Sequence, residues 1–346
     1  GPAWSNSLFE DAAEFGFGMR LAVDSRASLA LQLVTQLRAQ VGEALADEIA
    51  LGHGARGDDA MAAQRARVEK LTAELARLEA DSATDEATRT LVTRLQTVTE
   101  ALVPRQVWVI GGDGWAYDIG FGGVDHVLAS GRDVNMLVLD TEVYSNTGGQ
   151  ASKSTPRGAV AKFAASGKSV GKKDLGQIAM AYGGAYVAQI SLGASPKQAV
   201  EVLREAAAWP GPSLVIAYSP CIAHGYDLSG HMTHQRDAVR AGYLMLYRYD
   251  PAKALAEDGG EPLTLDSRPP RDSLAAWQAK EGRFAVLSRS QPDRADALTK
   301  LAESDAKMRR LHYEHMAGLH EEMPDKAAAE AAQTAKKSAK ATEGQE

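Results

Sequence analysis

The chain has 346 residues, 45% of them hydrophobic and 24% charged, and a formal net charge of −7. This composition is typical of a soluble globular protein with one large or two smaller domains, and it excludes collagen, bulk disorder and a disulfide scaffold. The acidic balance argues against a nucleic-acid-binding protein, and no apolar run or leader suggests a membrane span or a secretory signal, so we expect a cytoplasmic protein.

The first residues, Gly1-Pro2-Ala3-Trp4, do not resemble the start of a gene product. We therefore expect a chain cut from a longer polypeptide, with a tag-protease scar as the alternative. Residues 7–23 mix large apolar side chains with acids and two glycines, which is typical of a loop that leads into a helix. We assign residues 1–23 to the truncated amino-terminal part of the main domain.

A helical segment is predicted from residue 24 to residue 102. Apolar residues recur at helical spacing from Asp24 to about Leu51, and Asp24 or Ser25 is the candidate cap. Glycines at 52–57 end this helix. Two more helices are expected between residues 58 and 102, and their many charges indicate a solvated helix face.

The residue pattern changes at Arg105, where β-rich apolar runs begin. Apolar runs predict four strands, at 107–110, 135–140, 185–190 and 213–218. A helix at 119–130 is expected between the first two strands and a helix at 195–209 between the last two. Strand, glycine turn, helix and strand in this order indicate parallel βαβ units. Residues 103–250 therefore predict an α/β fold with a doubly wound, mostly parallel sheet and helices on both faces.

Beyond residue 250 the pattern loosens. Prolines mark extended connections, and we expect an extended and helical segment over 251–322, with a short edge strand at 283–287 and a charged helix at 292–316. Residues 324–346 contain no aromatic and no large aliphatic side chain, so a disordered tail is expected over 323–346.

Two loops that leave neighbouring strands carry the chemistry. Gly111-Gly112-Asp113-Gly114 follows the first strand and residues 140–149 follow the second, at the sheet edge where open α/β sheets bind ligands. Glycines let a phosphate approach the backbone closely. The Asp113 carboxylate, the Thr141 hydroxyl and the Val143 carbonyl are hard oxygen ligands for Mg²⁺ or Ca²⁺. A Gly-Asp-Gly triplet alone is more often a simple turn, but the two loops together predict a divalent-metal diphosphate site.

This pair of loops resembles the thiamine-diphosphate motif, in which a Gly-Asp-Gly triplet is followed after about this interval by an Asn pair. Thr141 lies 28 positions after Asp113, and Asp140-Thr141 stands where two asparagines are usual. The stretches GDGWAYDIG (112–120), DTEVYSNTGGQ (140–150) and GAVAKFA (158–164) are similar to pyruvate:ferredoxin (flavodoxin) oxidoreductase. The resemblance runs from Gly1 to about Met316 and matches the carboxyl-terminal portion of a much larger enzyme.

The resemblance implies a thiamine-diphosphate-binding fold with a helical insert. It implies Mg²⁺ ligation by Asp113, Thr141 and the Val143 carbonyl, and a catalytic role for Asn146, whose amide would donate to the oxyanion of a bound 2-oxo acid. An Asx turn is the alternative for Asn146. The implied contacts to thiamine diphosphate come from Gly112, Asp113, Gly114, Trp115, Thr141, Val143 and Asn146.

The resemblance further implies that the whole enzyme oxidatively decarboxylates pyruvate with coenzyme A to acetyl-CoA and CO₂. Electrons would pass through iron–sulfur clusters to ferredoxin or flavodoxin. Cys221, the single cysteine, would be the fourth ligand of a [4Fe–4S] cluster whose other ligands lie outside this chain; a buried free cysteine is the alternative. We expect a homodimer at full length and an isolated chain that is inactive without the remaining domains.

Several alternatives stay open. The enzyme could act on another 2-oxo acid, decarboxylate without oxidation, or be a non-catalytic assembly module with this fold. His224, His231 and His234 are interpreted as polar loop residues rather than as a zinc site. The basic residues at 153–173 would attract coenzyme A or an acidic ferredoxin, or form a solvated loop. Other polar residues near the two loops shape the pocket or fix the loops; they are Tyr117, Asp118 and Glu142.

Overall fold

A computed structural model describes residues 2–7, 10–54, 56–256 and 259–318 of the chain. The predicted tail at 323–346 lies outside these residues, as does Gly1. Among the described residues, no helix has both the length and the apolar character needed to cross a lipid bilayer.

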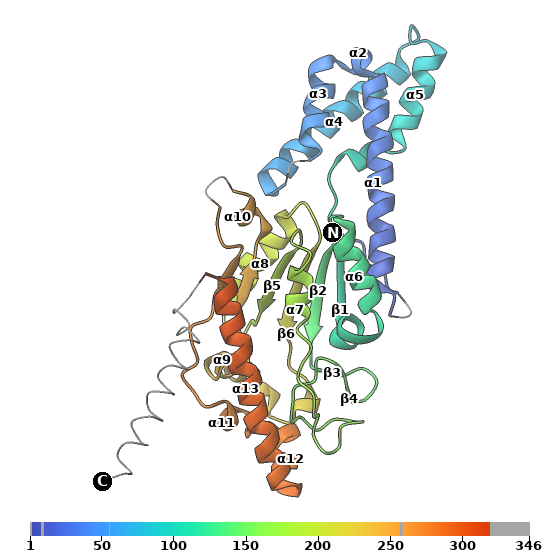
Figure 1. The fold of residues 1–346 in the computed structure, drawn as a ribbon. Helices are drawn as coiled ribbons and strands as arrows, with labels where there is room; N and C mark the ends of the chain where they lie inside the picture. The colour runs from blue at the N-terminus through green and yellow to red at the C-terminus, as the bar shows by residue number, and fades with distance from the viewer. Residues whose placement is uncertain (1, 8–9, 55, 257–258, 319–346) are drawn as a thin grey trace, which may run out of the picture.

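A six-stranded sheet lies at the centre of the α/β part (Figure 1), with strand order β1-β2-β6-β5-β7-β8. The strands are β1 (Trp108–Gly112), β2 (Asn135–Asp140), β5 (Tyr186–Ile190), β6 (Ser213–Tyr218), β7 (Tyr247–Tyr249) and β8 (Leu263–Leu265). The first four are parallel to one another, whereas β7 is antiparallel to both β5 and β8. The mostly parallel sheet and its four predicted strands are confirmed, and β7 and β8 are additions that the sequence pattern did not predict.

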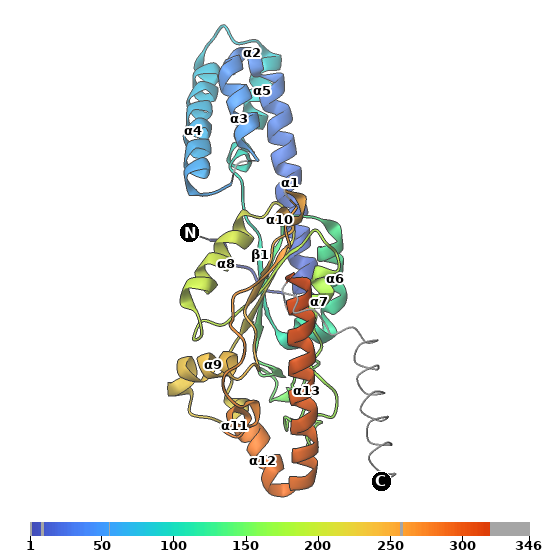
Figure 2. The same ribbon diagram turned by 60° about the vertical axis from the view of Figure 1, so that its left-hand side comes forward.

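Helices cover both faces of this sheet, as predicted (Figure 2). On one face lie the first half of α1 (Ala12–Gln36), α6 (Phe121–Ser130), α7 (Leu175–Met180) and α13 (Pro292–Met316). Their side chains share one buried apolar cluster with β1, β2, β5 and β6. The opposite face packs on α8 (Pro196–Ala208), which forms a second cluster with β5 and β6. Because α8 lies over β5 and β6, it leaves β1 and the end of β2 partly open: Ile110 and Leu139 are 46% and 41% exposed.

The helical segment has a core of its own. It comprises the second half of α1, α2 (Arg38–Val41), α3 (Glu43–Gly52), α4 (Asp58–Ala80), α5 (Glu86–Gln96) and the 3₁₀ turn η1 (Thr99–Leu102). These elements bury a separate apolar cluster that includes Leu33, Leu37, Ile49, Leu71 and Leu75. Two helices between residues 58 and 102 are therefore confirmed.

The predicted start of the first helix at Asp24 is wrong. α1 begins at Ala12, and Asp24 and Ser25 lie within it rather than capping it. The reason is Gly16, which weakens the helical pattern in the sequence but is needed where α1 crosses β1. A Cβ at Gly16 would lie 2.2 Å from a methyl carbon of Val109. The predicted single helix to Leu51 is also divided: α1 ends at Gln36, and Gly42 (φ 96°) separates the short α2 from α3.

The predicted edge strand at 283–287 is wrong as well. These residues lie in α12 (Gly282–Ser290), whose buried residues Arg283, Phe284 and Leu287 recur at helical spacing. A five-residue apolar run does not distinguish strand from helix, and here the helical face packs beside α13. The predicted helix at 292–316 is confirmed as α13. The remaining short helices of this region are α9 (His231–Arg240), α10 (Pro251–Leu255) and α11 (Leu274–Gln278).

Candidate functional site

The two predicted loops meet at the carboxyl edge of the sheet because β1 and β2 are adjacent and in register, with Gly112 opposite Leu139. Asp113 begins the π-helical turn η2 (Gly114–Ile119), and Thr141 precedes the short strand β3 (Val143–Tyr144). The Thr141 hydroxyl lies 2.9 Å from a carboxylate oxygen of Asp113 and 3.1 Å from the Val143 carbonyl oxygen. The three predicted metal ligands therefore converge.

The surroundings of Asp113 favour a cation. Its side chain is 1% exposed, and its second carboxylate oxygen accepts a hydrogen bond from Ser152 at 2.6 Å. Burial raises the pKa of the Asp113 carboxyl to about 7, and the charge of Asp140 adds to this effect. A divalent ion would stabilise the ionised form. In the described part of the chain no three His, Cys, Asp or Glu residues cluster as metal ligands, so this site depends on a hydroxyl and a carbonyl.

A pocket of about 560 Å³ opens beside this oxygen set, within the size range of small-molecule sites. Its floor is the loop at Gly112, where an added Cβ would meet no atom within 4 Å, so a ligand can approach the backbone closely. Trp115 is 7% exposed and packs its ring against Gly111. Asn146 also lines the pocket, and its exposed side chain makes no hydrogen bond to the described residues, so the bond that an Asx turn requires is missing.

Two buried carboxylates of the second loop, residues 140–149, hold this loop in place, and we call it the metal loop because it carries two of the predicted metal ligands. Asp140 accepts hydrogen bonds from Tyr117 at 3.0 Å and from Ser154 at 2.5 Å, and it pairs with Lys172 at 2.6 Å. Glu142 is 1% exposed and has a left-handed backbone (φ 61°), an uncommon conformation for a residue other than glycine.

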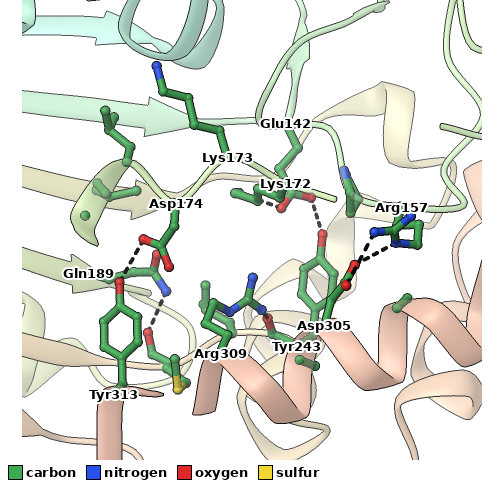
Figure 3. A pocket seen from close by; sticks show the side chains of 18 of the residues that line it. Glu142, Arg157, Lys172, Lys173, Asp174, Gln189, Tyr243, Asp305, Arg309 and Tyr313 are labelled. Atoms are coloured by element: carbon green, nitrogen blue, oxygen red, sulfur yellow. Dashed lines mark hydrogen bonds and ion pairs between the residues drawn. The ribbon is translucent and has the colours of Figure 1, made fainter. Parts of the chain in front are cut away.

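Glu142 has three partners, which Figure 3 shows in part. The Lys172 ammonium lies at 2.9 Å, the Tyr243 hydroxyl at 2.6 Å and the Arg283 guanidinium at 2.8 Å. Although burial alone raises the pKa of Glu142, the charges of Lys172 and Arg283 hold it well below its usual range. Arg283 also pairs with buried Glu281 at 2.6 Å.

The buried charges of this network are unequal. Two cations, Lys172 and Arg283, share it with four carboxylates, those of Asp113, Asp140, Glu142 and Glu281. With histidines counted as neutral, the excess is two negative charges when Asp113 is ionised. A divalent cation on Asp113 would balance it, which is a second reason that the residues fit a metal.

Cys221 lies at the same edge of the sheet, because β6 neighbours β2 and ends at Tyr218. Its side chain is 8% exposed, and the sulfur accepts a weak hydrogen bond from the Ala223 amide at 3.5 Å at the start of the 3₁₀ turn η3 (Ile222–His224). Cys221 is thus close to the metal loop in the fold, although it is 80 residues away in the sequence.

The interpretation of the histidines as polar loop residues is wrong for two of them. His224 is 0% and His234 7% exposed. His234 lies 2.8 Å from Glu281, and the ring of His224 faces the Thr141 carbonyl. Burial and the charge of Arg283 lower the pKa of His224 to about 4. Only His231 lies near the surface, with its ring 2.9 Å from the Leu228 carbonyl.

The basic residues at 153–173 mostly have partners inside the protein. Lys172 is part of the network, Arg157 pairs with Asp305 at 2.6 Å (Figure 3), and Lys168 donates to three backbone carbonyls. Lys153 pairs with Asp118 at 2.7 Å. These contacts show that Asp118, like Tyr117 and Glu142, fixes the loops.

Comparisons with known proteins show which proteins this chain is similar to. The family model "Thiamine pyrophosphate enzyme, C-terminal TPP binding domain" matches residues 96–217. The chain is 51% identical over 317 residues to the "Putative pyruvate-flavodoxin oxidoreductase" of Synechocystis and 48% identical over 330 residues to the pyruvate-flavodoxin oxidoreductase of Rhodospirillum rubrum. It is 46% identical over 318 residues to the pyruvate:ferredoxin oxidoreductase of Moorella thermoacetica. These alignments cover 92%, 95% and 92% of this chain.

The same alignments cover only 25–27% of each relative, so the chain spans about a quarter of the length of the curated relatives it matches. A solved 2-oxoglutarate:ferredoxin oxidoreductase from Magnetococcus marinus overlaps weakly, with 21% identity and a TM-score of 0.35 over 53% of this chain and 62% of that one. The family resemblance predicted from the motifs is confirmed by the sequence relatives.

Proposed function

We propose, on the premise that the chain belongs with the thiamine-diphosphate-binding region of the pyruvate-flavodoxin and pyruvate:ferredoxin oxidoreductases, that it holds thiamine diphosphate and Mg²⁺ for the whole enzyme. That enzyme would oxidatively decarboxylate pyruvate with coenzyme A to acetyl-CoA and CO₂ and pass electrons through iron–sulfur clusters to ferredoxin or flavodoxin. The observation that carries the proposal is the convergence of Asp113, Thr141 and the Val143 carbonyl beside the 560 Å³ pocket.

Asp113, Thr141 and the Val143 carbonyl would hold Mg²⁺, and the backbone at Gly112 would leave room for the diphosphate. Gly114 and Trp115 continue the same wall of the pocket. When bound, thiamine diphosphate supplies the carbanion chemistry that decarboxylates 2-oxo acids. The network behind the loop would keep the three oxygens in place.

Asn146 would act as a catalytic hydrogen-bond donor. Its amide lines the pocket and is not used by a hydrogen bond to the described residues, so it can donate to the substrate oxygen on which negative charge develops. In the complete enzyme, the Asn146→Ala variant should lose kcat by about 10²- to 10³-fold, the usual effect of removing one such donor, with thiamine diphosphate still bound.

Cys221 would ligate a [4Fe–4S] cluster together with cysteines from the remaining domains of the enzyme. Its position at the same edge of the sheet as the metal loop supports this role, because electrons leaving the thiamine site would have a short path. The single cysteine cannot bind a cluster alone, so reconstitution of this chain with iron and sulfide should yield no stable cluster.

The site as formed by this chain is incomplete. Large apolar side chains around the pocket are exposed, and the remaining domains or the second subunit of a homodimer would cover them; they are Trp4, Phe15, Met19, Ile110, Ile119 and Leu139. We therefore expect the isolated chain to bind thiamine diphosphate without oxidising pyruvate. Measurable pyruvate oxidation by the isolated chain would refute this.

Calorimetric titration with thiamine diphosphate and Mg²⁺ tests the proposal. The wild type should bind and Asp113→Asn should not, because the amide keeps the shape of the side chain but removes the charge. Asp125→Asn is the control, since this carboxylate lies in α6 and accepts its hydrogen bond from Tyr182, and neither residue lines the pocket. No binding by the wild type would favour a non-catalytic module. In the full enzyme, release of an aldehyde without reduced ferredoxin would favour a simple decarboxylase.

A further inference from the structure

His224 joins the metal loop to the turn that carries Cys221. Its imidazole is completely buried, and Nε2 lies 2.8 Å from the backbone carbonyl oxygen of Thr141. His224 ends the 3₁₀ turn Ile222–His224, which Cys221 caps. One ring therefore contacts a predicted metal ligand and lies three residues from the predicted cluster ligand.

The chemistry of this contact fixes the direction of the hydrogen bond. A carbonyl oxygen only accepts, so Nε2 must carry the proton and donate. Nδ1 is buried without a hydrogen-bond partner among the described residues, and its nearest carboxylate oxygen, on Glu281, is 4.0 Å away. The hydrogen bond from Nε2 is therefore the one by which the imidazole holds the Thr141 carbonyl.

The bond continues the pairing of β2 and β6 beyond the end of the sheet. The Ser219 amide donates to the Asp140 carbonyl at 2.9 Å, and the next carbonyl, that of Thr141, accepts from His224. The peptide that follows leads into Glu142, whose left-handed backbone is held by the buried network. With its carbonyl fixed, Thr141 keeps its hydroxyl on Asp113.

The ring itself has little freedom to move. The rings of Tyr218 and Tyr226 both lie nearly parallel to it, each with a centroid separation of 6.1 Å. Gly225, directly after His224, has a left-handed backbone, and an added Cβ there would lie 2.9 Å from the backbone of Gly282. The turn Ile222–His224 thus packs closely against the start of α12. His224 is therefore a rigid link between this turn and the metal loop.

We propose that His224 is a positioning residue that holds Thr141 in its metal-ligating orientation and ties the Cys221 turn to the metal loop. The inference rests on the proposed function for the identity of the metal site. Removing a hydrogen-bond partner that orients a metal ligand typically changes metal affinity by about 10- to 100-fold.

Two substitutions separate the hydrogen bond from the packing. In His224→Gln, the amide N–H can take the place of Nε2–H, whereas His224→Leu keeps a similar size without a donor. We expect the Kd for Mg²⁺ at saturating thiamine diphosphate to rise about 10- to 100-fold in His224→Leu and to stay within about threefold in His224→Gln. His231→Leu, a histidine of the same segment that does not touch the metal loop, should leave Mg²⁺ affinity unchanged.

Alkylation of Cys221 gives a second readout that needs no metal. Because Cys221 is the only cysteine, iodoacetamide uptake by the metal-free chain reports on this turn alone. The rate should rise at least about fivefold in His224→Leu, whose turn is no longer held, and return toward the wild-type rate in His224→Gln.

The outcomes distinguish the inference from the function beneath it. If the wild type binds Mg²⁺ and thiamine diphosphate and a folded His224→Leu binds them equally well, the positioning role is wrong. If His224→Leu does not fold, His224→Gln still decides, because loss of Mg²⁺ affinity there contradicts the donor role. If the wild type binds neither ligand, the proposed function fails, and unchanged alkylation of Cys221 in the Leu variant would overturn the link as well.

Discussion

Lys172 offers a direct test of the buried network. Its ammonium pairs with Asp140 at 2.6 Å and with Glu142 at 2.9 Å, and the three side chains are 16%, 2% and 1% exposed. Burial alone would lower the pKa of Lys172, yet the two carboxylates raise it above its ordinary value, so the residue is charged at neutral pH. We predict that Lys172→Met strongly destabilises the α/β part of the chain.

The magnitude follows from what remains after the change. Removing one partner of a buried pair costs about 3–5 kcal/mol, because an uncompensated charge stays in a medium of low dielectric constant. Asp140 would keep Tyr117 and Ser154, and Glu142 would keep Arg283 and Tyr243, so we expect the lower end of that range, about 3 kcal/mol.

Lys153→Met is the matched control. Lys153 lies in the same loop and pairs with Asp118 at nearly the same distance, 2.7 Å, but its side chain is 62% exposed. Ion pairs in water contribute about 0.2–1 kcal/mol, so this variant should be nearly as stable as the wild type. The two lysines differ mainly in burial.

Urea unfolding followed by tryptophan fluorescence measures both variants. None of the five tryptophans lies within residues 24–102, so the signal reports on the α/β part rather than on the helical segment. Adding Asp140→Asn to Lys172→Met should recover part of the lost free energy of unfolding, since it removes one of the uncompensated charges. Equal losses in the two single variants would refute the idea that burial makes this network important.

Three further predictions concern the metal site and the helical segment. Because burial raises the pKa of Asp113 to about 7, protons compete with Mg²⁺ for this carboxylate below pH 7. The Mg²⁺ affinity measured by calorimetry should therefore fall about tenfold for each pH unit below 7 and be constant above it. An affinity that does not change with pH would contradict this. Gly112→Ala should leave the free energy of unfolding unchanged within about 1 kcal/mol, since its Cβ meets no atom, yet weaken thiamine diphosphate binding; unchanged affinity would mean that the backbone is not approached closely. Leu71 is fully buried in the helical segment, so Leu71→Ala should lower the free energy of unfolding by about 2–5 kcal/mol, measured by urea unfolding followed by circular dichroism. The Mg²⁺ affinity should not change, and a change would show that the helical segment supports the site.

The central sheet and the convergence of the three proposed metal ligands could be predicted because both follow from local features of the sequence. Each strand is a short apolar run, and two such runs joined by one helix have to lie side by side in a parallel βαβ unit. Side chains directly after the two runs then meet at one edge. Asp113 and Thr141 were found in this way, and their 2.9 Å contact follows from the adjacency of β1 and β2.

The errors arose where short patterns are ambiguous. Three-residue strands such as β7 and β8 have too few residues to show a period, and the run at 283–287 fits a strand or a helix equally well. Gly16 weakens the helical pattern of the sequence, although its small size is what allows α1 to cross β1. In each case the deciding contact comes from another part of the chain.

The contacts of the buried network next to the metal loop could not be predicted from the sequence. Glu142 and Arg283 are separated by 141 positions, and no spacing rule connects residues that meet only after α12 has packed on the core. One signal was nevertheless present in the sequence. Asp140 and Glu142 directly flank the proposed ligand Thr141 at the end of a strand, where burial is expected, and buried carboxylates require cations nearby. The basic residues at 153–173 are close enough in the chain to supply one, so Lys172 could have been assigned to the interior rather than to a surface that attracts acidic partners.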